Sequence, residues 1–134
     1  MIAVDTSVVV AAFASWHEAH RTAAQLLDRR PQVPAHALIE SYSVLTRLPA
    51  PHRASAEIAA AFLAERFPFP PITLPADAHA ALIAAAAAAG LTGGATYDAL
   101  IAATAKHAGA ALHTRDRRAL ATYERIGVRF ELME

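Results

Sequence analysis

The chain contains no cysteine among its 134 residues. Disulfide bonds and thiolate metal sites are therefore excluded, and the composition agrees with a reducing cytoplasm. Charge is scarce as well, because only 18% of the residues are charged while 55% are hydrophobic. This balance excludes a disordered chain. The length predicts one domain with one core, residues 1–134.

Neither sign of charge is in excess, because 12 basic residues balance 12 acidic ones. No overall field attracts the chain to nucleic acid, so such binding needs a local patch or an oligomer. The stretch AALIAAAAAAGL, residues 80–91, is too short and too rich in alanine to cross a bilayer. The start, MIAVDTS, has no basic region and does not match a secretory signal. The sequence thus predicts a cytoplasmic protein with no membrane segment.

Short apolar runs alternate with helical patterns along the chain. Strands are expected at 2–4, 32–34, 72–74, 110–114 and 128–132, and helices at 8–13, 17–27, 36–48, 55–67, 76–89, 96–108 and 118–125. This order predicts an α/β fold with a mainly parallel, short-stranded sheet flanked by helices. The helical spacing places Tyr42 and Ile58 on inward faces. Ligands of such sheets bind beyond the carboxyl ends of the strands.

Four carboxylates occupy unusual positions. Asp5 follows the first strand, and Asp116 lies two residues beyond Thr114, which ends a later one. Glu40 and Asp98 lie early in helices rich in apolar residues. A buried carboxylate is costly unless it is protonated, paired or bound to a cation. Four that converge would repel one another, and a hard divalent cation such as Mg²⁺ or Mn²⁺ would relieve that repulsion.

Each acid also has an ordinary structural explanation when it is taken alone. Asp5 and Asp98 could cap helices, and Asp116 could be a turn residue. Glu40 could pair with Arg47 on its own helix. Only the joint placement of the four on separate segments, which a sheet could bring together, favours a metal site.

Three stretches that contain these acids resemble PIN-domain proteins, and among them VapC-type toxin ribonucleases. They are MIAVDTSVVVAAF at 1–13, ALIESYSVLTRLP at 37–49 and TYDALIAATAKHAGAALHTRD at 96–116, with a short final strand after them. The resemblance extends over the whole chain. It implies a PIN-like three-layer sandwich and a Mg²⁺- or Mn²⁺-dependent endoribonuclease, the toxin component of a type II toxin–antitoxin system.

The resemblance also implies roles for particular residues. Asp5 and Asp98 would be direct metal ligands. Glu40 and Asp116 would bind the ion directly, through water, or position the attacking water. Thr114 matches the hydroxyl residue that stands two positions before the last acid, and it belongs to the expected catalytic set. A water activated by the ion would attack an RNA phosphodiester in line and leave a 5′-phosphate and a 3′-hydroxyl.

The partners follow from the same resemblance. It implies a small VapB-like antitoxin whose C-terminal segment covers the site, a homodimer, and a toxin–antitoxin hetero-oligomer. RNA would be the substrate, and no membrane would be involved. Four arginines could contact the RNA backbone, with solvated surface residues as the alternative for each: Arg47, Arg115, Arg117 and Arg118.

Three other functions stay open at this point. A phosphatase or receiver-like domain with Asp5 as nucleophile usually needs a second aspartate two positions on, where Ser7 stands, or an opposing lysine, of which Lys106 is the only one. A PIN-like module could hold RNA or an antitoxin with little or no turnover. Finally, the acids could serve only as caps, in which case no metal would bind.

Overall fold

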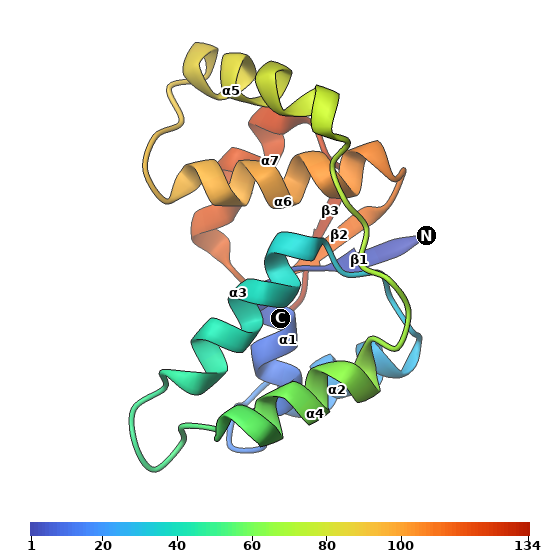
Figure 1. The fold of residues 1–134 in the computed structure, drawn as a ribbon, viewed down its shortest axis with the longest axis vertical. Helices are drawn as coiled ribbons and strands as arrows, with labels where there is room; N and C mark the ends of the chain where they lie inside the picture. The colour runs from blue at the N-terminus through green and yellow to red at the C-terminus, as the bar shows by residue number, and fades with distance from the viewer.

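A three-stranded parallel sheet lies between helices in the computed structural model, which describes residues 1–134 (Figure 1). Its strands are β1 (Ile2–Val4), β2 (Ala111–Thr114) and β3 (Phe130–Leu132), in the order β1-β2-β3. The helices are α1 (Thr6–Phe13), α2 (His20–Asp28), α3 (Ala35–Thr46), α4 (Ala56–Arg66), α5 (His79–Ala88), α6 (Ala95–His107) and α7 (Leu120–Ile126), with short 3₁₀ turns η1 (Ala76–Ala78) and η2 (Arg117–Ala119). The predicted α/β class with a parallel sheet is confirmed.

Two of the expected strands are reduced to single bridges. Gln32 pairs only with Ala3, and Ile72 pairs only with Pro34. Prolines interrupt both segments, at 31 and 34 and at 70, 71 and 75. Because proline has no N–H to donate to a ladder, neither segment can extend its pairing. The sheet therefore has three strands instead of the five that the sequence predicted.

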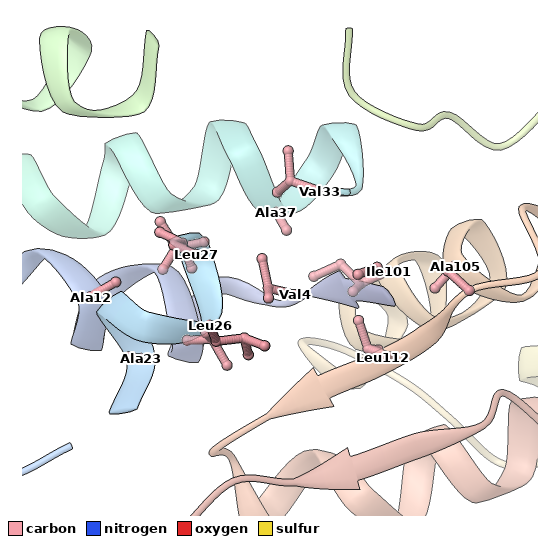
Figure 2. Packing of buried hydrophobic residues seen from close by; sticks show 14 of the residues in the cluster. Val4, Ala12, Ala23, Leu26, Leu27, Val33, Ala37, Ile101, Ala105 and Leu112 are labelled. Carbon is pink, nitrogen blue, oxygen red and sulfur yellow. The ribbon is translucent and has the colours of Figure 1, made fainter. Parts of the chain in front are cut away.

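The core forms where β1 and β2 meet the helices around them. Figure 2 shows Val4, at the end of β1, among buried side chains from α2, α3, α6 and β2. Val4 and Leu112 are completely buried, and Ile101 is 1% exposed. Val4 belongs to one core cluster with side chains of α1, α3 and α6, which are the elements that position the site, so this packing fixes the carboxyl end of β1 among them.

Two inward-facing predictions are wrong. Tyr42 on α3 is 38% exposed and Ile58 on α4 is 58% exposed. The buried rows are instead Ala37, Ser41 and Leu45 on α3 and Ala59 and Leu63 on α4. Both rows follow a spacing of four residues, and Tyr42 and Ile58 each lie one position away from a row and face outward. No helix has both the length and the apolar content needed to cross a membrane.

Candidate functional site

Asp5 lies at the junction of β1 and α1 and is 3% exposed. It caps α1, because its Oδ1 accepts hydrogen bonds from the Ser7 backbone N–H at 3.0 Å and the Ser7 hydroxyl at 2.5 Å. Burial raises the pKa of Asp5, while hydrogen bonds from Ser7, Thr114 and Tyr123 lower it in part. The capping explanation is thus correct, but it uses only one of the two carboxylate oxygens.

Tyr123 on α7 holds the other oxygen of Asp5. Its hydroxyl donates to Asp5 Oδ2 at 2.7 Å, and the tyrosine itself is only 1% exposed. Burial and the neighbouring Asp5 charge raise the pKa of Tyr123 far above its usual value, so the hydroxyl stays protonated and remains a donor. The sequence analysis missed this residue. The helical pattern of LATYERI could place Tyr123 in the core, but not beside Asp5.

Glu40, on α3, is half-buried and faces α1. The hydroxyl of Thr6 donates to Glu40 Oε1 at 2.5 Å, and His36 Nε2 lies 3.9 Å from Oε2. The expected contact with Arg47 is absent, because Arg47 NH1 donates to Ser43 Oγ at 2.5 Å. Ser43 is one helical turn from Arg47, whereas Glu40 is two turns away, so the nearer oxygen is the partner.

Asp98 lies in the first turn of α6 and is half-buried. Its pKa is raised from the ordinary value of 3.8 to about 6. Burial is the largest cause, followed by the negative charges of Asp116, Glu40 and Asp5, with Arg118 opposing them. Asp98 therefore experiences the charge of all three other acids.

Asp116 follows β2 and caps η2. Its Oδ1 accepts from the backbone N–H of Arg118 at 3.0 Å and lies 3.3 Å from Arg118 Nε. Its own backbone N–H donates to Thr114 Oγ1 at 3.0 Å. Thr114 is completely buried, and its hydroxyl also lies 3.4 Å from Ser7 Oγ. The structure thus places Thr114 behind the carboxylates, where it fixes the chain that presents Asp116.

The four predicted acids line one small cavity of about 40 Å³. Its walls also include hydroxyl groups and one apolar side chain, and the full set is Asp5, Thr6, Ser7, Glu40, Asp98, Ile101, Asp116 and Tyr123. Five of these residues also line a larger groove of about 670 Å³, together with His17, Arg47, Arg115 and Arg118. Acids from four separate segments therefore meet at the bottom of a groove with basic residues on its walls.

The donor set of this cavity fits a hard divalent cation. Its polar groups are carboxylates and hydroxyls, which are the oxygen ligands that Mg²⁺ and Mn²⁺ prefer. In their present positions no three acidic or histidine side chains are arranged to hold a metal ion. Asp5, Glu40 and Asp116 each accept hydrogen bonds from the protein. A carboxylate has about four lone-pair sites, so these bonds leave room for an ion, and coordination requires the acidic side chains to approach one another more closely.

The four arginines have different surroundings. Arg47, Arg115 and Arg118 line the groove, whereas Arg117 lines a neighbouring cavity and pairs with Glu134. Arg118 is 92% exposed and pairs with Asp116, so its charge stands beside the acids.

Comparison with known proteins identifies the family of the chain. Residues 2–125 match the model of the PIN domain family. The chain is 51% identical to ribonuclease VapC40 of Mycobacterium tuberculosis (strain CDC 1551 / Oshkosh), over 99% of both chains. It is 44% identical to ribonuclease VapC27 of strain ATCC 25618 / H37Rv, over 95% of this chain and 93% of the relative.

Solved structures share the fold at lower identity. VapBC2 from Rickettsia felis, bound to a DNA fragment from its promoter, matches with a TM-score of 0.69 and 18% identity over 100% of both chains. FitAcB from Neisseria gonorrhoeae matches with a TM-score of 0.68 and 20% identity, over 97% of this chain and 96% of the other. The chain therefore belongs to the PIN-domain family, and within it to the VapC-type ribonucleases.

Proposed function

We propose that this protein is the toxin of a type II toxin–antitoxin system and hydrolyses RNA phosphodiesters at the carboxylate cavity with Mg²⁺ or Mn²⁺. The observation that supports this most directly is that four acids from separate segments line one cavity, where burial and the charges of the other three acids raise the pKa of Asp98. Such mutual repulsion disfavours the cavity without a cation and favours binding of one. Family membership supplies the reaction, because the VapC relatives are ribonucleases.

Asp5 and Asp98 would hold the ion, with Glu40 and Asp116 binding it or a water beside it. The ion, when bound, supplies an activated water and stabilises the charge that develops on the phosphoryl oxygens. Tyr123 orients Asp5 through its hydrogen bond to Oδ2. Thr6 orients Glu40 in the same manner, and Thr114 fixes the backbone of Asp116. Hydrogen bonds to α1, β2 and α7 thus orient three of the four acids, Asp5, Glu40 and Asp116.

The partners follow from the relatives. The similar structures include VapBC2 from Rickettsia felis and a FitAB structure bound to DNA, which supports a VapB-like antitoxin for this chain. A homodimer and a toxin–antitoxin hetero-oligomer are part of the same proposal. Residues 1–134 would act as one domain, and the RNA substrate indicates the cytoplasm as the place of action.

The experiment compares RNA cleavage by the wild type, Asp5→Asn and Asp98→Asn. Both substitutions are expected to abolish cleavage, and EDTA is expected to stop the wild type until Mg²⁺ or Mn²⁺ is restored. Asp77→Asn is the matched control, because Asp77 is an exposed aspartate in η1 outside the cavity. Full cleavage by folded Asp98→Asn protein, or by the wild type in EDTA, would reject the mechanism.

Calorimetry with Mn²⁺ separates the alternatives. A protein that binds Mn²⁺ but turns over no RNA would be a PIN-like binding module for RNA or antitoxin. A protein that binds no metal would use its acids only as caps.

A further inference from the structure

His17 lies in the loop between α1 and α2 and lines the groove above the carboxylates. Its backbone N–H donates to Ala14 O at 2.9 Å, and the preceding Trp16 stacks on His52 with ring centroids 4.0 Å apart. The loop therefore holds the imidazole in a defined place.

Both ring nitrogens of His17 face hydrogen-bond donors. Nδ1 accepts from the backbone N–H of Ala19 at 3.0 Å, and Nε2 lies 3.2 Å from Arg115 NH1. A neutral imidazole has one N–H and one lone pair, and a guanidinium has donors only. When the lone pair of Nδ1 accepts from the Ala19 N–H, the ring proton is on Nε2, so two N–H donors, that of the ring and that of the guanidinium, face each other. In the other tautomer the ring N–H faces the Ala19 N–H instead. In an imidazolium both ring N–H groups face donors.

The guanidinium of Arg115 is short of acceptors as well. Its Nε is buried and has no hydrogen-bond partner. The nearest acid is Glu18, whose Oε1 lies 3.8 Å from NH2 and whose side chain is 87% exposed. The backbone N–H of Arg115 donates to Ser7 Oγ at 2.8 Å, and the Ser7 hydroxyl in turn donates to Asp5. This places Arg115 next to a residue of the carboxylate cavity. N–H groups of His17 and Arg115 that have no acceptor in the protein therefore lie close together beside the carboxylate cavity.

We propose that His17 and Arg115 form a subsite for a phosphate of the RNA strand next to the one that is cleaved. This inference rests on the proposed function. A phosphate oxygen between Nε2 and the guanidinium would accept from both and remove the conflict between two donors. RNA also needs such a contact, because the four acids repel its backbone. Arg115 lines both the groove and the adjoining cavity that contains Arg117, so a strand held here could continue past the site.

The first test titrates inorganic phosphate into the metal-free wild type and follows the side-chain nitrogen resonances of His17 and Arg115 by NMR. Phosphate is expected to shift the His17 Nε2 and Arg115 Nε signals, whereas acetate at equal ionic strength is not. Unchanged signals would overturn the phosphate subsite. An equal response to acetate would overturn it as well, because the site would then bind anions in general.

The second test measures binding of a short labelled RNA in EDTA at several salt concentrations. Arg115→Gln is expected to lower the slope of log affinity against log salt by about 0.7, the value for one phosphate contact on a single strand. His17→Asn keeps an acceptor for Ala19 and removes the ring N–H, and a several-fold loss of affinity is expected. Arg21→Gln is the control, because Arg21 is exposed on α2 and lines neither the groove nor the adjoining cavity.

The two proposals fail in different ways. If Arg21→Gln weakens RNA binding as much as Arg115→Gln does, the subsite is wrong even though metal-dependent cleavage persists. If phosphate binds at His17 and Arg115 but the wild type cleaves no RNA with any divalent ion, the nuclease function is wrong and the anion site remains.

Discussion

Replacing Asp98 with asparagine is expected to stabilise the metal-free protein. The pKa of Asp98 is raised from 3.8 to about 6, so the charged form is disfavoured in the folded state. At about 1.36 kcal/mol per pKa unit the rise corresponds to about 3 kcal/mol. Asp98 is only half-buried, and solvent screening reduces the gain to about 1–2 kcal/mol. Asparagine resembles the protonated acid, so it removes this penalty.

The sign of the effect sets its pH dependence. Because the folded-state pKa is raised, the penalty is absent below the unfolded-state value of 3.8, grows as the pH rises from there to about 6, and is complete above it. Wild type and Asp98→Asn should therefore be equally stable at about pH 3 and differ fully at about pH 7. Urea unfolding in EDTA, followed by circular dichroism, measures this difference. Equal stability at pH 7, or an equal gain at both pH values, would refute the raised pKa of Asp98 that burial and the neighbouring acids cause.

A divalent ion should reverse the order of stability. Mn²⁺ at 100 times its dissociation constant stabilises the wild type by about 2.7 kcal/mol, whereas Asp98→Asn loses a ligand and gains less. Asp77→Asn should behave as the wild type does in both conditions.

Three further substitutions test the supports of the site and of the fold by urea unfolding. Tyr123→Phe should lower the free energy of unfolding by about 1.5–3 kcal/mol, because the buried Asp5 loses a charged hydrogen bond; an unchanged midpoint would contradict that bond. Ser7→Ala should cost about 1–3 kcal/mol, since it removes both the donor to Asp5 and the acceptor for the Arg115 backbone, and Ser7→Thr should recover part of the loss. Gly127→Ala should cost about 1 kcal/mol or more, because Gly127 has φ 86° and the new Cβ would lie 3.2 Å from Lys106 Nζ, whereas Gly94→Ala, in a helical conformation with open space, should be neutral or stabilising.

The sequence contained enough local information for the fold class, because β-prone runs, caps and glycines follow each other in an α/β order. It also singled out the four acids that the cavity brings together, since a carboxylate after a strand or in an apolar helix face is conspicuous. The partners of those acids were harder to predict. The Tyr123–Asp5 bond joins residues 118 apart and the Thr6–Glu40 bond joins residues 34 apart. The helical or strand periodicity of a single segment gives no information on contacts between residues so far apart in the sequence.

Outward-facing side chains were mispredicted for a related reason. Helical spacing shows that residues share a face, but it does not show which face meets the core. On α3 the row that meets the core is Ala37, Ser41 and Leu45, and Tyr42, one position away from that row, lies outside. The proline-bounded segments failed as strands because their prolines have no N–H to donate to a ladder, a limit that the apolar pattern of each segment does not express.

The order of strands along the chain also determines when the cavity can exist during synthesis. β1 pairs in register with β2, Ile2 opposite Ala111, and Asp5 is held by Tyr123. A ribosome must therefore add 118 residues after the first aspartate before Tyr123, its hydrogen-bond partner, exists. Until then the growing chain contains acids but not the pocket that brings them together.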